Sequence, residues 1–138
     1  MQKIEHIAIA VRSLDTAIPL YEKLLGTPCY KREAVASEKV TTAFFKTGET
    51  KVELLESSDE SGVIARFIEK KGEGLHHIAF SVADITEEIK RLKSEGFEFI
   101  SEEPKRGADN KMICFLHPKH TTGVLIELCQ DMGSVTQD

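Results

Sequence analysis

Two histidines and two glutamates recur at matching points of a sequence that repeats itself. The segments IEHIAIAVRSL (residues 4–14) and LHHIAFSVADI (residues 75–85) share His-Ile-Ala, so His6 and His77 are 71 residues apart. Each copy ends in an apolar run with an embedded glutamate, Glu53 in KVELLE and Glu127 in GVLIELC, and these are 74 residues apart. A duplicated unit folded about a pseudo-twofold axis would bring the four side chains to one place. Two imidazoles and two carboxylates in one cleft form a divalent-metal site, which is our central prediction.

The recurrence of these residues is what favours a metal site over ordinary structural roles. A single histidine on a strand is more often a core or surface residue than a ligand. Glu53 and Glu127 stand among apolar neighbours, and strand alternation points each of them away from those neighbours. A carboxylate on the inner face of a sheet is costly unless it meets a cation or hydrogen-bond donors. The alternative, two solvated glutamates, requires two coincidences. Alignment of the copies selects His77 over its neighbour His76.

The ligand types limit which metal the site would take. Mixed nitrogen and oxygen ligation is unlike a structural zinc site and suits Co²⁺, Mn²⁺, Ni²⁺, Fe²⁺ or Zn²⁺ with open positions. We predict Co²⁺ first among these ions. Four protein ligands on a six-coordinate ion leave two positions free, which would fit a substrate that chelates through two oxygens.

Each half of the chain reads as βαβββ. Strand-like alternation, helix caps and turn signals predict the first half, with Ser13 as N-cap, Pro19 as a cause of a local kink, Gly26 as the stop and Gly48-Glu49 as a tight turn. Its predicted elements are a strand at 4–11, a helix up to Gly26 and strands at about 28–35, 40–47 and 50–56. After a polar break at 57–61, a short helix leads to the second copy. The predicted elements of that copy are a strand at 75–82, a helix capped by Asp84 and Glu87 that ends at Gly96, and strands at about 97–101, 111–117 and 123–129.

One such module has too few strands to cover its own sheet, so the two are expected to fold together. We therefore predict an α+β fold in which two tandem βαβββ modules form a single curved mixed sheet, a half-barrel. The predicted organisation is one domain over residues 1–138. Its parts are module 1 at about 3–57, a bridging helix at about 61–71, module 2 at about 74–130 and a frayed tail at 131–138.

Composition excludes several classes of protein. The 138 residues are 41% hydrophobic and 30% charged, which is ordinary for a globular domain. The net charge of −5 argues against general nucleic-acid binding. No apolar run approaches the roughly 18 residues that a membrane span needs. The N-terminus resembles neither a signal nor a transit peptide, so we expect a cytoplasmic protein. Cys29, Cys114 and Cys129 are expected to be reduced, largely buried thiols.

With these residues in view, the chain resembles the vicinal oxygen chelate superfamily and, within it, the methylmalonyl-CoA epimerase family. The resemblance covers about residues 3–130. It rests on HIAIAV, KVELLE, GEGLHHIAFSV, SEEPKRGADNK and FLHPKHTTGVLIEL. The last segment is the most specific, because the sibling glyoxalase I family typically carries Asp-Pro-x-Gly before its final glutamate strand. By this resemblance His6, Glu53, His77 and Glu127 are the metal positions, and the second of them is Gln in some members.

The resemblance implies interconversion of (2R)- and (2S)-methylmalonyl-CoA by removal and return of the C2 proton. A metal would stabilise the enolate as a Lewis acid. A proton acceptor is needed on each face of the enolate, and we predict Glu127 for one. Some members place the second base where this chain has Thr42, which cannot serve. Glu53, our choice for the second base, Glu38 or a metal-bound water would have to replace it.

The remaining expectations concern the substrate and the assembly. An acyl-CoA carries phosphates, so a basic rim is expected, with Lys105, Arg106, Lys111 and Lys119 as candidates. Each of these has a plain alternative as a solvated charge. His117 is a candidate for substrate contact or for a surface turn. The resemblance also implies a homodimer.

Three other functions are compatible with parts of this pattern. A glyoxalase I-type lactoylglutathione lyase shares the ligand set. An extradiol dioxygenase needs only two histidines and one carboxylate on iron, and the fourth ligand Glu53 argues against it. A metal-free binding protein of the same fold, like the bleomycin-sequestering proteins, usually lacks the full ligand set.

Overall fold

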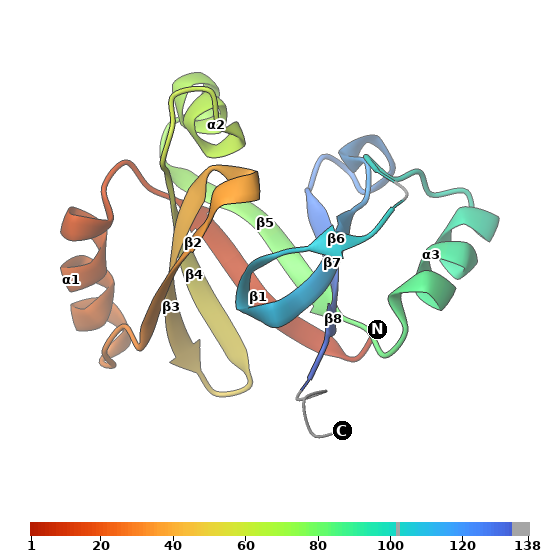
Figure 1. The fold of residues 1–138 in the computed structure, drawn as a ribbon, viewed down its shortest axis with the longest axis horizontal. Coiled ribbons are helices and arrows are strands. Elements are labelled where there is room, and N and C mark those ends of the chain that lie inside the picture. The colour runs from red at the N-terminus through yellow and green to blue at the C-terminus, as the bar shows by residue number, and fades with distance from the viewer. Residues whose placement is uncertain (102, 134–138) are drawn as a thin grey trace. The chain divides into compact units, whose positions relative to one another are not determined.

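The computed structural model describes residues 1–101 and 103–133 of the chain. Within these residues it has the expected α+β class, and the two βαβββ modules are confirmed. The chain divides into two compact units, His6–His76 and a second unit that joins His77 onward to residues 1–5. Figure 1 labels their elements. No helix in the described part of the chain is long and apolar enough to cross a membrane.

The first unit is built on a four-stranded mixed sheet with the order β2-β3-β4-β1. Its strands are β1 (Lys3–Ala10, which begins in the residues assigned to the second unit), β2 (Lys31–Val35), β3 (Val40–Thr47) and β4 (Thr50–Ser57). β1 runs parallel to β4, and β3 and β4 form a hairpin around Gly48, whose φ of 63° suits glycine. The sequence predicted this turn at Gly48-Glu49, and the prediction is confirmed.

Two helices cover opposite faces of this sheet because β1 alternates. α1 (Leu14–Leu25) packs Leu14 and Ala17 with Ile7 and Ile9 of β1. α2 (Val63–Lys71) packs Ile64 against Ala8 and Ala10. His6 shares the strand face of Ala8 and Ala10, so the helix that covers its side of the sheet is α2.

The ends of α1 agree with the sequence prediction. Ser13 is the N-cap, and its hydroxyl accepts a hydrogen bond from Thr16 N at 3.3 Å. Glu56 of β4 accepts from Leu14 N at 2.7 Å, so a strand of the same unit satisfies another free donor of the helix. Gly26 closes the helix at φ 69°, and Pro19 lies inside it.

The second unit repeats the order as β5-β8-β7-β6. Its strands are β5 (Gly74–Ser81), β6 (Lys105–Arg106), β7 (Lys111–Phe115) and β8 (Ile126–Asp131), and β5 runs parallel to β8. α3 (Ile85–Ser94) begins at Asp84, whose Oδ1 accepts from Glu87 N at 3.1 Å, as the capping pattern predicted. α3 packs on the face of β8 that carries Leu128, which leaves the opposite face to Glu127 and Cys129.

One predicted strand is misplaced. Residues 97–101 form no regular strand, although Phe99 makes an isolated bridge with Leu116 and Ile100 N donates to Phe115 O at 2.9 Å. The short strand that pairs with β7 is Lys105–Arg106. A one-turn 3-10 helix (Ala108–Asn110) with Asp109 at φ 61° and Asn110 at φ 56° reverses the chain and pairs these two strands. Asp and Asn tolerate this left-handed conformation better than most residues, so GADN was the turn signal that sequence reasoning missed.

The expected frayed tail falls mostly outside the described residues, which end at Gly133. Asp131 belongs to β8, and Met132 N donates to Asn110 O at 3.1 Å. The beginning of the predicted tail is therefore ordered against the turn between β6 and β7.

Candidate functional site

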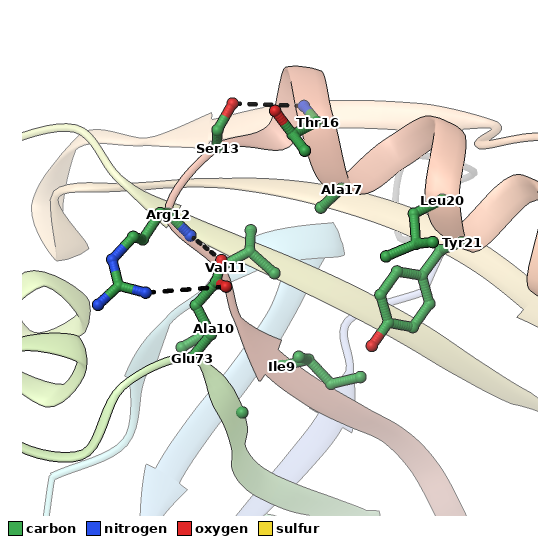
Figure 2. Close-up of a pocket in the computed structure, with 11 residues that line it drawn as sticks. Ile9, Ala10, Val11, Arg12, Ser13, Thr16, Ala17, Leu20, Tyr21 and Glu73 are labelled. Carbon is green, nitrogen blue, oxygen red and sulfur yellow. Dashed lines mark hydrogen bonds and ion pairs between the residues drawn. The ribbon is translucent and has the colours of Figure 1, made fainter.

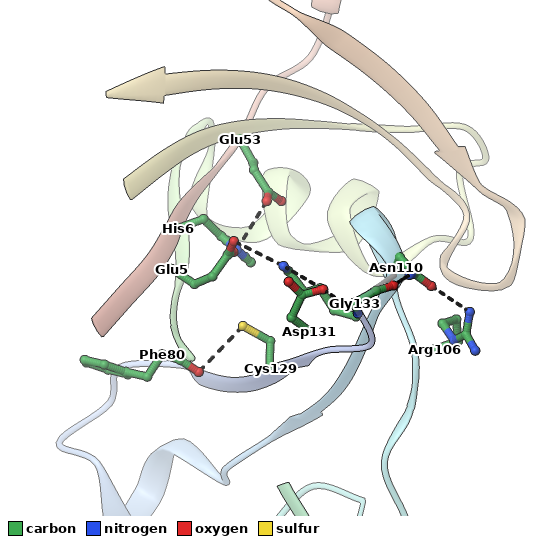
Figure 3. A network of polar contacts seen from close by, with 10 residues as sticks. Glu5, His6, Glu53, Phe80, Arg106, Asn110, Cys129, Asp131 and Gly133 are labelled. Carbon is green, nitrogen blue, oxygen red and sulfur yellow. Dashed lines mark hydrogen bonds and ion pairs between the residues drawn. The ribbon is translucent and has the colours of Figure 1, made fainter. Parts of the chain in front are cut away.

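His6 and Glu53 are brought together in the first unit. His6 lies on β1 and Glu53 on the neighbouring strand β4, where Ala8 is the residue paired with Glu53. The two residues are each 5% exposed, and His6 Nδ1 is 3.2 Å from Glu53 Oε2 (Figure 3). The parallel pairing of β1 with β4 is what places this imidazole beside this carboxylate.

His77 and Glu127 form the matching pair in the second unit. His77 Nε2 is 2.8 Å from Glu127 Oε1, and the residues are 6% and 4% exposed. The ring of Phe115 meets the His77 ring edge-on, with centroids 5.3 Å apart. His76 instead contacts Phe67 of α2, with ring centroids 4.9 Å apart, and is only half-buried.

The surroundings of the two glutamates repeat as well. Each glutamate lies between an alanine on the parallel neighbour and a phenylalanine on the antiparallel one: Ala8–Glu53–Phe44 in the first unit and Ala79–Glu127–Phe115 in the second. Both carboxylates are thus buried between apolar side chains, where a charge needs a cation or donors. The donor set, one imidazole and one carboxylate in each unit, fits a divalent ion of the borderline kind.

The two pairs differ at the hairpin that precedes the glutamate. Phe44 and Phe115 are 71 residues apart, whereas Glu53 and Glu127 are 74 apart, so the three extra residues lie between β7 and β8. There the chain forms a 3-10 turn, Pro118–His120, and Thr121 Oγ1 donates to Val124 O at 2.6 Å. Thr122 has φ 55°, which is strained for a β-branched residue. This loop ends one residue before β8, so it leads directly into Glu127.

The structure adds a buried carboxylate that sequence reasoning missed. Glu5 directly precedes His6 and is 5% exposed. Lys111, predicted as a rim lysine, is also buried, and its Nζ is 3.6 Å from Glu5 Oε2. Strand alternation placed Glu5 on the side away from His6, and a lone lysine in a polar segment gave no sign of burial. Lys111 is therefore paired inside the protein and is not an exposed rim cation.

The other candidates for a basic rim lie on the surface of the second unit. Lys105 and Arg106 are exposed on β6, and Arg106 Nη1 donates to Asn110 Oδ1 at 3.0 Å (Figure 3). Lys119 Nζ is 3.0 Å from Glu98 Oε1. The hydrogen bond from Lys119, with a smaller contribution from His120, lowers the pKa of Glu98 below its ordinary value.

His117 has a defined orientation. Its Nδ1 accepts a hydrogen bond from Lys119 N at 3.2 Å, and its own backbone N donates to Glu98 O at 2.7 Å. An imidazole that accepts through Nδ1 carries its proton on Nε2 when neutral. His117 therefore presents Nε2–H as a donor from a half-buried position.

Thr42, which stands where some relatives have a base, is 1% exposed on β3. Strand pairing puts Thr42 on the face of the first unit that carries Glu53 and Phe44. Glu38 lies in a 3-10 turn, Ala36–Glu38, before β3. Of these residues, Glu53 is the carboxylate in contact with His6.

The cysteines have no predicted chemical role, and this agrees with their surroundings. All three are free, and Cys114 and Cys129 are buried. Burial raises the pKa of the Cys114 thiol to about 12, and the nearby negative charge of Glu127 adds to the rise. A thiol with such a pKa stays protonated at neutral pH and is a poor nucleophile.

A cavity of about 460 Å³ lies elsewhere in the first unit, where β1 leads into α1 (Figure 2). Ile9, Val11 and Tyr21 line it, and Arg12 meets Glu73 at its edge, where Arg12 N donates to Glu73 Oε2 at 2.7 Å. Ile9 and Val11 lie on the strand face opposite His6. None of the predicted site residues lines this cavity, so we do not place the chemistry there.

Comparison with known proteins defines the class of the protein. Residues 5–115 match the family model of the Glyoxalase/Bleomycin resistance protein/Dioxygenase superfamily, and the chain belongs to this superfamily. The matched segment contains three of the four predicted metal ligands and ends before Glu127.

Particular relatives narrow the comparison. The chain is 41% identical over 133 residues to the uncharacterised protein YqjC of Bacillus subtilis, which covers 96% of this chain and 95% of that protein. It is 40% identical over 130 residues to the ethylmalonyl-CoA/methylmalonyl-CoA epimerase of Cereibacter sphaeroides, with 93% and 97% covered. A solved methylmalonyl-CoA epimerase in complex with methylmalonyl-CoA and NH4+ matches with a TM-score of 0.89, 32% identity and 96% of each chain covered.

Proposed function

We propose that the protein is a methylmalonyl-CoA epimerase, an isomerase that acts on a CoA thioester. The observation that carries the proposal is the repeated buried His–Glu pair, His6 with Glu53 and His77 with Glu127, in a chain whose relatives include epimerases over almost its whole length. A two-base epimerisation needs one proton-transfer group for each face of the enolate, and two carboxylates can supply them.

The reaction requires balanced proton transfer at C2. In our proposal Glu127 accepts the C2 proton on one face, and the electron pair of the C–H bond moves into the thioester to give an enolate. On the other face Glu53, which starts in its protonated form, gives its proton to C2 and becomes a carboxylate, and the reverse reaction starts from the opposite protonation states of the two residues. No oxidant or further reactant is needed. Burial between Ala and Phe side chains keeps water away from both carboxylates.

A divalent metal is the cofactor in this proposal, with His6, Glu53, His77 and Glu127 as the residues that hold it. Such an ion supplies Lewis-acid stabilisation of the negative charge on the thioester oxygen. An ion bound there would have to replace the direct contact between His77 Nε2 and Glu127 Oε1, because that contact uses a ligand atom of each residue. We propose Co²⁺ first, with Mn²⁺, Ni²⁺, Zn²⁺ and Fe²⁺ as the other candidates.

The substrate and assembly proposals come from the surface charges of the second unit and from the family. Lys105, Arg106 and Lys119 are surface cations of the second unit and are proposed to meet the CoA phosphates. His117 is proposed to donate to the acyl group through Nε2–H. One domain over residues 1–138, a half-barrel formed by both modules, a homodimer and a cytoplasmic location remain predictions from the sequence and the family.

Deuterium wash-in tests the function. The metal-loaded protein in D2O should incorporate deuterium at C2 of both epimers of methylmalonyl-CoA, as followed by mass spectrometry. It should not convert the hemithioacetal of methylglyoxal and glutathione. The absence of C2 exchange, or turnover of the hemithioacetal in its place, would reject the epimerase in favour of a lyase or a binding protein.

A further inference from the structure

Thr42 carries a buried hydroxyl on the face of the first unit that holds Glu53. Phe44 of β3 pairs with Glu53 of β4. Thr42, two residues before Phe44, pairs with Leu55, so the four side chains share one face of the two strands. Thr42 and Glu53 are thus diagonal neighbours of an antiparallel pair, and the Cα atoms of such neighbours lie about 7–8 Å apart. A small acyl group in contact with Glu53 can span this separation.

The hydroxyl of Thr42 has no hydrogen-bond partner among the residues that the structure describes. Thr42 is only 1% exposed, so bulk water reaches it poorly. Glu33 pairs with Thr42 from β2, but its Oε1 lies 3.7 Å from Lys31 Nζ. Buried hydroxyls in proteins nearly always have a partner in the protein, in water or in a ligand. For this hydroxyl the described part of the chain supplies none.

The fold alone does not call for a hydroxyl at this position. Val40 and Phe44 flank Thr42 on the same face of β3. Val40 and Leu55 pack with Ile64 of α2. Valine has the same β-branched shape that suits a strand, and it would extend this apolar surface. A hydroxyl that is buried without a partner destabilises the folded protein. Thr42 therefore carries a polar group that a bound ligand would satisfy.

We propose that Thr42 is a substrate-binding residue whose hydroxyl donates a hydrogen bond to an oxygen of the malonyl group held at Glu53. This inference rests on the proposed function. The malonyl group offers two kinds of acceptor beside C2. The carboxylate is charged throughout, and the thioester oxygen gains charge in the enolate. A hydrogen bond to a charged acceptor is about twice as strong as one between neutral groups, so it can hold C2 toward Glu53.

Thr42→Val is the direct test, because it exchanges the hydroxyl for a methyl group. The value of kcat/KM for C2 exchange of methylmalonyl-CoA should fall by about 10- to 100-fold, the loss expected for one hydrogen bond to a charged group. The urea midpoint of unfolding should be no lower than that of the wild type, because the free protein loses no hydrogen bond. Thr42→Ser keeps the hydroxyl and should retain most of kcat/KM.

Thr41→Val is the matched control. Thr41 is the preceding residue of β3 and lies on the opposite face, where it pairs with Glu56. The same exchange of a hydroxyl for a methyl group should leave kcat/KM unchanged there. A difference between the two valine variants thus reports which face of the strand carries the hydroxyl.

Binding measurements identify the acceptor oxygen. Propionyl-CoA keeps the thioester but lacks the carboxylate, so calorimetry with it separates the two kinds of acceptor. If the thioester oxygen accepts, Thr42→Val weakens the binding of methylmalonyl-CoA and of propionyl-CoA. If a carboxylate oxygen accepts, the variant weakens the binding of methylmalonyl-CoA alone. Either result supports the inference.

Three results would overturn the inference. The first is a Thr42→Val protein with the kcat/KM of the wild type. The second is a lower urea midpoint or failure to fold, which would mean that the hydroxyl has a partner within the fold. The third is weaker binding of CoA without an acyl group, which would move the contact away from the malonyl group. In all three cases C2 exchange by the wild-type protein leaves the proposed function standing, whereas its absence would reject both.

Discussion

At the scale of single residues, the structure supports different tests for the two glutamates. Glu127 is buried, in contact with His77, and next to the loop that distinguishes the second module from the first. Glu53 is equally buried but stands in the position where some family members have Gln. The two side chains should therefore respond differently to the same substitution.

Glu127→Gln should lower the rate of C2 exchange by about 10²- to 10⁴-fold, because an amide cannot accept the proton. The amide keeps the size of the side chain, so unfolding by urea should change little. The measurement is deuterium incorporation from each epimer under single-turnover conditions. An exchange rate within about tenfold of wild type would remove Glu127 from the role of base.

Glu53→Gln should keep the metal but impair exchange from one epimer more than from the other. A Gln oxygen is a competent ligand in some relatives, whereas it is no base. Metal analysis and exchange from separate (2R) and (2S) substrates check the two halves of this prediction. Equal loss from both epimers would place the second proton acceptor elsewhere, with Glu38 as the next candidate.

The raised pKa of the Cys114 thiol predicts that the stability of the protein depends on pH. Burial raises the pKa of its thiol from the ordinary 9.0 to about 12. Between these values the unfolded chain releases a proton that the native protein keeps, so the native state loses stability as the pH rises. The urea unfolding free energy should therefore fall more steeply between pH 9 and 11 in the wild type than in Cys114→Ala. Equal slopes would show that Cys114 does not contribute.

At the scale of elements, the sequence predicted most of what positions the site. Alternation and repeated His-Ile-Ala located β1 and β5, and the caps Ser13, Gly26 and Asp84 located the ends of the helices. These signals are local, so a single sequence carries them. The repeat predicted that each His and each Glu has a counterpart in the other half, and both halves do use the same strand order. It did not predict the parallel pairing that sets each His beside the Glu of its own module.

What the sequence did not predict depends on non-local pairing. Residues 97–101 have the right residue types for a strand but make only a bridge and two backbone hydrogen bonds with residues 115–117. The turn through Asp109 and Asn110 instead pairs Lys105–Arg106 with β7. Lys111 and Glu5 are buried together, although they lie 106 positions apart in the chain. No local pattern marks such a pair.

The cap of α3 offers a test at this scale. Asp84→Ala removes the acceptor for Glu87 N and should lower the free energy of unfolding by about 1 kcal/mol. Glu87→Gln keeps the backbone donor and is the matched control, with an expected change within about 0.5 kcal/mol. Neither variant should alter metal binding. A cap variant as stable as the control would mean that this hydrogen bond contributes nothing measurable.

At the scale of the whole molecule, the proposed metal should act on stability as any ligand of the native state does. At a free Co²⁺ concentration 100 times its Kd, the unfolding free energy should rise by about 2.7 kcal/mol. The melting temperature should rise accordingly and return to its starting value with a chelator. An unchanged melting temperature across a titration would contradict specific binding to the folded protein.

The central claim is that one pair from each module serves a single cation, and the stoichiometry of Co²⁺ binding tests it most directly. Calorimetric titration should give one ion per chain for the wild-type protein, and either His6→Ala or His77→Ala should abolish tight binding. An account with one shared ion is contradicted if each variant still binds one ion at the remaining pair, or if the wild-type protein binds none.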